Sequence, residues 1–377
     1  MQMTQEINTM IEAMADEHLA LLETLAQIPA PSGKEHKRVE FCIQWLRDNG
    51  VTDVQVDEAL NVICSFGVTE DNDLVMFAAH SDVVFPDMEP LPLRRDGSKV
   101  CCPGVGDDTA SVVALMLIAR YLAQNNLKPA KGGLIIAINS AEEGLGNLAG
   151  SRKLMETYGK RLREFITVDG RIGYAVDQAV GSRRFRIEVD TEGGHSYGKF
   201  GNRNAIAYLA SLIDTLYTMK VPEGGRTTYN VGTISGGTSV NTIAQHAEML
   251  YEFRSDDRNS LEIMGKHLDA AIEFYRAKGV KVTVTVVGDR PCSGDVDQEA
   301  FAALKARCSE INKRHFGNDL VFVRGSTDCN IPLSLGIPAL CLGATDHVGA
   351  HTREEYLDVD CLTPGLKYIF DVVLQNF

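Results

Sequence analysis

Two adjacent glutamates, Glu142 and Glu143, follow an uninterrupted apolar run and have the chemistry of a metal ligand and a proton acceptor. The run, residues 133–138, is typical of a strand buried on both faces in a parallel sheet. Ligands bind at the carboxyl ends of strands in open α/β sheets, so an active site is expected here. Neighbouring residues on an extended chain point in opposite directions, which gives the two carboxylates different roles. A solvated surface pair is the alternative.

Three further apolar runs end in side chains that can bind metal. These runs and the polar residues after them are 74–79 with His80 and Asp82, 165–168 with Asp169, and 338–343 with His347 and His351. Imidazole and carboxylate together suit zinc or another first-row divalent ion. The gathering of His, Asp and Glu at the ends of several strands therefore predicts a metal site.

Helical segments alternate with these strands. Helical apolar spacing covers residues 6–26, 35–49, 107–123, 149–158 and 297–316. Asp107 and Asp108 would lie in the first turn of their helix, where acidic residues suit the helix N-terminus. The alternation predicts an α/β fold with a mostly parallel sheet.

The pattern changes between residues 184 and 291. Residues 185–190 alternate apolar and polar, as a half-exposed antiparallel strand does. The order strand, helix, strand, strand, helix, strand predicts a ferredoxin-like module. We therefore expect two domains: a catalytic domain of residues 1–183 and 292–377, and an inserted lid and dimerisation domain of residues 184–291.

Composition narrows the class of protein. A chain of 377 residues with a net charge of −14 is a poor partner for nucleic acid or an anionic membrane surface. No stretch resembles a membrane span or a signal peptide. Nine scattered cysteines are expected to be reduced and mostly buried, which favours a cytoplasmic protein. Four histidines in polar helical surroundings are expected at the surface: His18, His36, His267 and His315.

The chain resembles the di-zinc metallopeptidase family that includes peptidase T, carboxypeptidase G, aminoacylase and succinyl-diaminopimelate desuccinylase. The matching motifs, which together span nearly the whole chain, are His80-Ser81-Asp82, Gly104-Val105-Gly106-Asp107-Asp108, Ala141-Glu142-Glu143-Gly144, Asp169-Gly170, Gly193-Gly194-His195-Ser196 with Asn204-Ala205-Ile206, and His351 with Glu355. The peptidase T branch is the most similar. Thr109 departs from the lysine that many members have, which argues against the desuccinylase branch.

The resemblance implies a centre of two divalent ions, Zn2+ first, with Co2+ or Mn2+ as alternatives. Asp107 would bridge the ions, His80 and Asp169 would complete one site, and Glu143 and His351 the other. The final ligand of the family lies four residues before a glutamate, here Glu355, so His351 is preferred to His347. A cis peptide bond between Asp107 and Asp108 is also implied.

Catalytic roles follow from the same resemblance. Metal coordination lowers the pKa of water to about 7, giving a metal-bound hydroxide. Glu142 would act as general base, and Asp82 would fix the tautomer of His80, unless it is only a loop carboxylate. His195 would stabilise the oxyanion across a homodimer interface, using the exposed edge of the strand at 185–190 for pairing. The alternative for His195 is a loop histidine in a turn.

Substrate contacts are expected from two places. Asn241 and Arg254 match family positions that bind the carboxylate and backbone of the substrate, although Arg254 could instead pair with Asp256 or Asp257. A small polar loop, Gly325, Ser326 and Thr327, resembles the loop that lines the substrate site and, taken alone, is only a turn.

These residues together predict a two-metal amide hydrolase, most like an aminopeptidase that acts on short peptides. An N-acyl-amino-acid deacylase or a carboxypeptidase of the same family is the first alternative. The second is a catalytically silent relative that binds metal and peptide-like ligands. The presence of Glu142 argues against it, because binding alone needs no general base.

Overall fold

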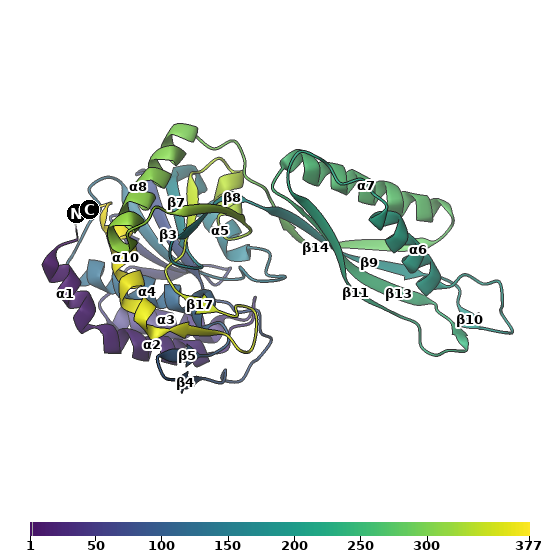
Figure 1. Ribbon diagram of the computed structural model, residues 1–377, viewed down its shortest axis with the longest axis horizontal. Coiled ribbons are helices and arrows are strands. Elements are labelled where there is room, and N and C mark those ends of the chain that lie inside the picture. The colour runs from purple at the N-terminus through teal and green to yellow at the C-terminus, as the bar shows by residue number, and fades with distance from the viewer. Residues whose placement is uncertain (2) are drawn as a thin grey trace. The chain divides into compact units, whose positions relative to one another are not determined.

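The computed structural model describes Met1 and residues 3–377, which form two compact units (Figure 1). The first unit comprises Met1–Ala179 and Gly294–Phe377, and the second comprises Val180–Ser293. Each unit has its own cluster of buried apolar side chains. Strand β9 begins at Gly181, so the boundary expected after residue 183 falls inside this strand.

The first unit is built on an eight-stranded sheet. Its strands, in spatial order, are β1 (Val54–Val56), β2 (Val62–Phe66), β6 (Gly133–Asn139), β3 (Leu74–His80), β7 (Leu162–Val168), β16 (Ala339–Leu342), β8 (Tyr174–Ala179) and β15 (Val321–Gly325). The central neighbours β6, β3, β7 and β16 run parallel. Every residue of β3 and β6 is buried, as expected for strands covered on both faces. The predicted α/β fold with a mostly parallel sheet is confirmed.

Helices surround this sheet. They are α1 (Gln5–Ala13), α2 (Ala15–Gln27), α3 (His36–Asp48), α4 (Ala110–Gln124), α5 (Ala149–Tyr158), α8 (Gln298–Phe316), α9 (Asn330–Ser334) and α10 (Leu362–Leu374). The predicted helix over 6–26 is interrupted at Met14. His18 is only 2% exposed, so its expected surface position is wrong: it lies on the buried face of α2.

The predicted helix over 107–123 starts later than expected. Asp107 and Asp108 have non-helical backbone angles, and α4 begins at Ala110. The peptide bond between the two aspartates is cis, as the resemblance implied. The acidic pair therefore belongs to an irregular turn before the helix rather than to its first turn.

A small antiparallel sheet lies beside this turn in the first unit. Its strands are β17 (His347–Val348), β18 (Tyr356–Asp358), β5 (Lys99–Cys101) and β4 (Arg94–Asp96). It connects the segment that carries His351 to the segment that leads into Asp107, because Tyr356 pairs with Cys101.

The second unit is a four-stranded antiparallel sheet with two helices. In sequence order its main elements are β9 (Gly181–Asp190), α6 (Ala205–Tyr217), β11 (Thr227–Gly236), β13 (His246–Ser255), α7 (Arg258–Ala277) and β14 (Lys281–Arg290). The spatial order β11-β13-β9-β14 confirms the ferredoxin-like prediction. A short ribbon of β10 (Gly194–His195) and β12 (Thr242–Ile243) extends from it.

One expectation about this sheet is wrong. Strand β9 offers no free edge for pairing, because β13 and β14 flank it along its whole length. The alternation at 185–190 reflects a central strand whose inner face packs under the helices: Phe185, Ile187 and Val189 belong to the buried core. The edges of the sheet are β11 and β14.

Among the described residues, no helix has both the length and the apolar character that a membrane span requires.

Candidate metal centre

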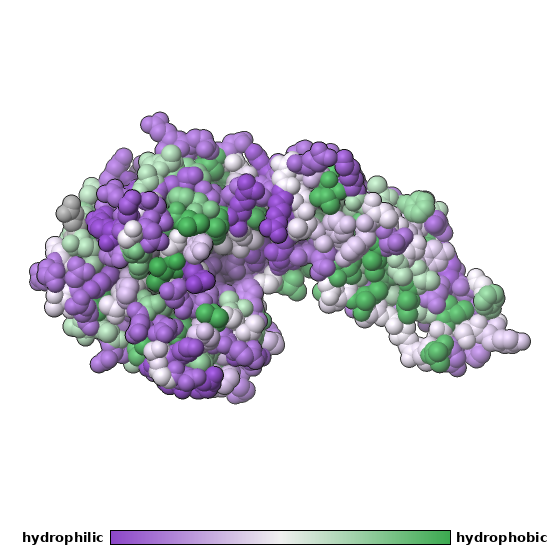
Figure 2. Space-filling model, in the orientation of Figure 1, coloured by the Kyte–Doolittle hydropathy of each residue, from purple (hydrophilic) through white to green (hydrophobic). Residues whose placement is uncertain are grey.

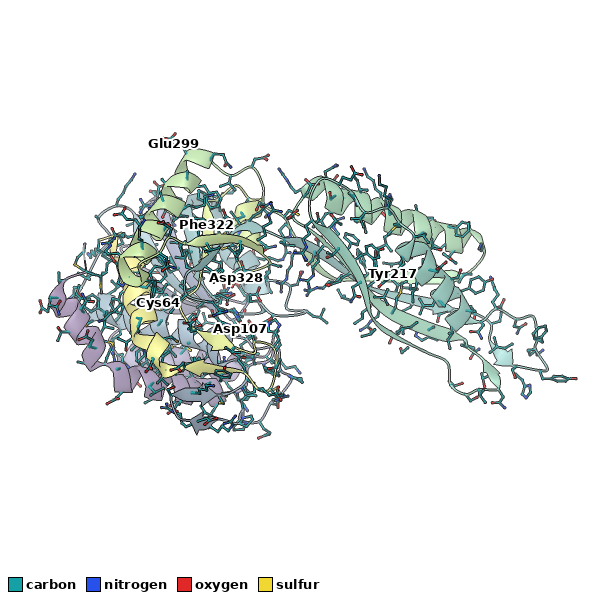
Figure 3. All side chains as sticks on the ribbon, in the orientation of Figure 1. Cys64, Asp107, Tyr217, Glu299, Phe322 and Asp328 are labelled. Carbon is teal, nitrogen blue, oxygen red and sulfur yellow. The ribbon has the colours of Figure 1, made fainter. Side chains whose placement is uncertain are left out.

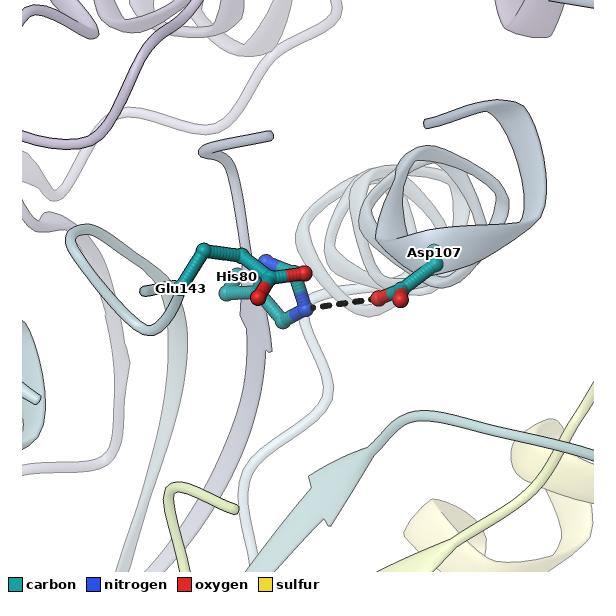
Figure 4. A group of neighbouring side chains, drawn as sticks. All are labelled: His80, Asp107 and Glu143. Carbon is teal, nitrogen blue, oxygen red and sulfur yellow. Dashed lines mark hydrogen bonds and ion pairs between the residues drawn. The ribbon is translucent and has the colours of Figure 1, made fainter. Parts of the chain in front are cut away.

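Three side chains of metal-ligand type converge in the first unit (Figure 4). His80 is the last residue of β3, Glu143 follows β6, and Asp107 lies in the turn before α4. One donor atom from each lies within 4.8 Å of the others. The Nε2 atom of His80 is 3.1 Å from Oδ1 of Asp107. Residues far apart in the sequence thus meet at the carboxyl ends of two parallel strands.

His351 joins this group from the loop after β17. Its Nε2 atom lies 3.0 Å from Oε1 of Glu143 and 3.2 Å from Oδ2 of Asp107. The two oxygens of Asp107 therefore face two different histidines. This is the arrangement that a carboxylate shared by two cations requires.

The pKa values of the side chains at this centre are shifted by burial and by their neighbours. Burial and the neighbouring charge of Asp107 raise the pKa of Asp169 to about 7. Hydrogen bonds to Asp107 and Glu143 raise the pKa of His351 to about 10. Burial opposes ionisation of Asp107, but its hydrogen bonds with His351 and His80 hold its pKa below the ordinary value. Three carboxylates and two imidazoles suit first-row divalent ions, so the residues fit a two-metal centre.

Four successive backbone amides around Glu142 and Glu143 donate to side chains from distant segments. The pairs are Ser140 to Asn61 Oδ1 (3.1 Å), Ala141 to Glu35 Oε1 (3.0 Å), Glu142 to Asp82 Oδ1 (2.9 Å) and Glu143 to Asp82 Oδ2 (2.9 Å). Charged acceptors make such bonds stronger than neutral ones. The turn that presents both glutamates is therefore fixed by its surroundings.

Asp82 contacts His80 less directly than expected. The Nδ1 atom of His80 is 3.1 Å from the backbone oxygen of Asp82 and 3.5 Å from its carboxylate. The carboxylate makes its shorter contacts with the two glutamate amides and with Ser32 Oγ at 2.6 Å. Asp82 thus connects the histidine to the glutamate turn, a role that sequence reasoning missed.

His351 and His347 differ in their surroundings. His347 is buried, its Nδ1 atom lies 2.8 Å from Thr345 Oγ1, and it packs closely against Gly106. His351 is exposed, and its ring faces the carboxylates of Asp107 and Glu143. The structure brings His351, rather than His347, together with Asp107 and Glu143.

The small polar segment begins at Gly325, the last residue of β15, and continues into a partly buried turn. Gly325 packs against Val176, and Thr327 is 9% exposed. The backbone N–H of Thr327 donates to Asn330 Oδ1, and its hydroxyl accepts from the N–H of Cys329. Ser326 lies between Gly325 and Thr327 in the sequence.

Asp328, the next residue, belongs to the same polar sequence motif, but it was not predicted to be a site residue. Figure 3 shows it within the first unit, and it is 1% exposed. Its carboxylate accepts from Asn139 Nδ2 at 2.7 Å and Ser151 Oγ at 2.5 Å. Asp328 therefore connects the loop to the end of β6 and to α5. The strand before it is largely exposed, so burial gives no signal for Asp328.

The second unit carries the other expected residues. His195 and Asn241 lie together on the exposed ribbon, because His195 pairs with Thr242 and Ser196 N–H donates to the backbone oxygen of Asn241. Arg254 is near the end of β13 and binds Glu252 through two nitrogens, at 3.0 and 3.2 Å. The ion-pair partner of Arg254 is thus Glu252, rather than Asp256 or Asp257, which were the alternative to substrate binding.

Comparisons with known proteins agree with this geometry. Residues 76–375 match the model of the peptidase family M20/M25/M40. A succinyl-diaminopimelate desuccinylase of Corynebacterium glutamicum is 25% identical over 96% of this chain and 97% of its own.

Solved structures with the same fold include an aminopeptidase PepT from Bacillus cereus (TM-score 0.72, 21% identity, 95% and 98% of the two chains covered). A tripeptidase from Staphylococcus aureus has a TM-score of 0.76 and 21% identity, with 95% and 97% covered. The YxeP protein of Bacillus subtilis, described as a dinuclear metal-binding peptidase, has a TM-score of 0.66 and 18% identity, with 97% and 100% covered. Because the family match covers most of the sequence, the chain belongs to peptidase family M20/M25/M40, a family of metallopeptidases and amidohydrolases.

Proposed function

We propose that this protein is a two-metal amide hydrolase that releases the N-terminal residue from short peptides. The observation that carries the proposal is the pair of contacts made by Asp107, whose two oxygens face His80 and His351. His80 and Asp169 would hold one ion, and Glu143 and His351 the other. Zn2+ is the ion we expect, with Co2+ or Mn2+ as alternatives.

Side chains of the protein would carry out the proton transfer. Two bound divalent ions would lower the pKa of water and so supply the nucleophile. Glu142 accepts the proton of that water and passes it to the leaving amine. Its side chain is 6% exposed, and its backbone is held by Asp82. This fixed position keeps the carboxylate oriented for proton transfer.

Substrate binding is assigned to the residues that match family positions. In the second unit, Arg254 and Asn241 would bind the carboxylate and backbone of a peptide. In the first unit, Gly325, Ser326 and Thr327 would line the active site. Arg254 exchanges part of its contact with Glu252 for the substrate carboxylate, which an arginine can bind bidentately. The PepT and tripeptidase structures favour a peptide substrate. The similarity to a desuccinylase keeps an N-acyl amino acid as the second candidate.

A substrate screen tests this proposal. The protein is stripped with a chelator, reloaded with zinc, cobalt or manganese, and assayed on dipeptides, tripeptides and N-acyl amino acids. We expect hydrolysis of peptides with a free amino terminus, lost with the metal and restored by its return. Cleavage of N-acyl amino acids alone would establish the deacylase, and inactivity on every class with both metals bound would establish the silent relative.

We further propose a homodimer formed through the second unit. Strand β11 is an edge of its sheet, and unpaired edges are natural pairing surfaces. Exposed apolar residues accompany it: Ile234 on β11 is 55% exposed, Ile206 on α6 is 42% exposed, and Val240 is fully exposed. Figure 2 shows apolar patches over this part of the second unit. Two-fold dimers are the commonest soluble oligomers.

In this dimer His195 donates to the oxyanion at the partner's active site. Loss of one oxyanion donor costs about 10²–10³ in rate, so His195→Ala would cut turnover without loss of metal. His195→Ala and Glu142→Gln are unfolded, mixed and refolded together. If His195 acts across the interface, each hybrid has one intact site and activity returns. If it acts within its own chain, every site carries one lesion and the mixture stays inactive.

A cytoplasmic location completes the proposal. All nine cysteines are free thiols, and eight of them are buried. Free thiols persist in reducing compartments. Cys101 is the single half-buried thiol. If a membrane-impermeant reagent modifies Cys101 only after cell lysis, the result supports this location.

A further inference from the structure

Glu35 is a buried carboxylate behind the glutamate turn. It precedes α3 and is 0% exposed. Its Oε1 atom accepts the backbone N–H groups of Gly33 at 2.8 Å and Ala141 at 3.0 Å. Its Oε2 atom is buried with no hydrogen-bond partner among the described residues. Burying a carboxylate that is only half satisfied costs stability.

The residue that Glu35 holds has an unfavourable backbone conformation. Ala141 has φ +54, in the left-handed region that residues with a Cβ avoid. The turn is also tight, because a Cβ on Gly146 would lie 2.6 Å from the oxygen of Ala141. Such conformations persist only where surrounding contacts hold them, and they concentrate at functional sites. Ala141 directly precedes Glu142.

We propose that Glu35 is a positioning residue for the proposed general base Glu142, and that it acts through the backbone of Ala141. The left-handed residue ends the extended course of β6 and sets the direction in which Glu142 leaves the chain. Glu35 fixes this turn at Ala141, whereas Asp82 fixes it at the next two amides. The inference rests on the proposed function of Glu142.

Glu35 and Asp82 hold different parts of the turn, so alignment of Glu142 and metal binding by Glu143 can be disturbed separately. Without Glu35, Ala141 is free to relax to negative φ, and the carboxylate of Glu142 loses its alignment. Glu143 keeps its bond to Asp82 and remains able to hold metal. The expected signature is therefore a lower kcat with unchanged metal content and KM.

Two variants at Glu35 test this signature. Glu35→Ala removes the acceptor, and we expect kcat to fall about 10²-fold, the loss typical of a small misplacement of a catalytic group. Glu35→Gln keeps an oxygen for Ala141 and is expected to retain kcat within about threefold, since the hydrogen bond is preserved. The control is Glu40→Ala, at an exposed glutamate on α3, the helix that Glu35 precedes.

A second substitution, at Ala141, tests whether Glu35 acts through the backbone conformation of that residue. Glycine adopts positive φ without steric cost, so Ala141→Gly should restore about tenfold of the lost kcat when added to Glu35→Ala. It does not replace the lost bond to Gly33. If Glu35→Ala does not fold, Glu35→Asp, which is too short to reach Ala141, takes its place in the same pair.

The outcomes are separable. Retained kcat in Glu35→Ala, metal loss parallel to activity loss, or no rescue by Ala141→Gly would overturn the inference. Full activity of Glu142→Gln would overturn the proposed function instead. An inactive Glu142→Gln beside a rescued Glu35→Ala supports both.

Discussion

Glu355 accepts the backbone N–H of Asp107 at 3.0 Å. The same carboxylate accepts the N–H groups of Gly104 at 2.6 Å and Gly106 at 2.8 Å. Burial raises the pKa of Glu355 to about 7. Glu355 entered the sequence argument only as the residue that marks His351. In the structure it holds the whole turn on which the bridging carboxylate lies.

Loss of Glu355 should weaken metal binding. Partners that orient a metal ligand are typically worth about 10–100-fold in affinity. We expect Glu355→Ala to lower metal affinity by this factor, measured by competition with a chromophoric chelator. Glu354→Ala, at an exposed neighbouring position, should leave affinity unchanged. Equal affinities for the two variants would contradict the assigned role of Glu355.

Arg38 should be essential for stability rather than for chemistry. It is 0% exposed, and burial lowers its pKa to about 10. Its guanidinium donates to the backbone oxygens of Ile28 at 2.7 Å and Ser81 at 2.9 Å, and to the hydroxyl of Thr109 at 3.1 Å. Arg38 thus connects α3 to the residues beside His80 and Asp107.

Removing this buried group leaves its oxygen partners unsatisfied. We expect Arg38→Leu to lower the free energy of unfolding by about 3–5 kcal/mol, measured by urea denaturation. Arg47→Leu, on the exposed side of α3, is the control and should cost far less. A stability loss no larger than that of the control would show that the bonds of Arg38 are replaceable.

His18 should make stability depend on pH. Burial lowers the pKa of His18 to about 4, and neither ring nitrogen has a hydrogen-bond partner among the described residues. The unfolded state, with a pKa near 6.5, therefore binds a proton at a higher pH than the folded state. Its stabilising contribution is complete above about pH 6.5 and is lost as the pH falls towards 4.

His18→Leu removes this dependence. Between pH 7.5 and 5 the native protein should lose about 2 kcal/mol more stability than the variant. Urea unfolding with a chelator present measures the difference without a contribution from metal release. His36→Leu, at an exposed histidine, should behave like the native protein. Parallel losses in His18→Leu and the native protein would refute the effect.

Sequence patterns predicted the strands and helices better than they predicted which elements pack against one another. The apolar composition of β3 and β6 predicts buried strands. The alternation of apolar and polar residues in β9 predicts a sheet with one covered face. Neither pattern tells which neighbours a strand has, so β9 was expected at an edge although it is central. Strand order depends on contacts between distant segments, which periodicity does not encode.

The supporting residues of the site were harder to find than its candidate ligands. His80, Asp107, Glu143 and His351 stand out because their types suit metal and the motifs locate them. Glu35 and Arg38 have the same sequence appearance as the solvated residues of an amphipathic helix. Their roles arise only when α3 packs against the ends of β3 and β6, which no local signal predicts.

The central claim is the division of labour between the adjacent glutamates. Glu142→Gln and Glu143→Ala are purified, and their metal content and turnover are measured side by side. We predict that Glu142→Gln retains both ions and loses about 10²–10⁴ in rate, as expected for removal of a general base. Glu143→Ala should lose metal together with activity. Equal metal loss in the two variants, or an active Glu142→Gln protein, would contradict the account.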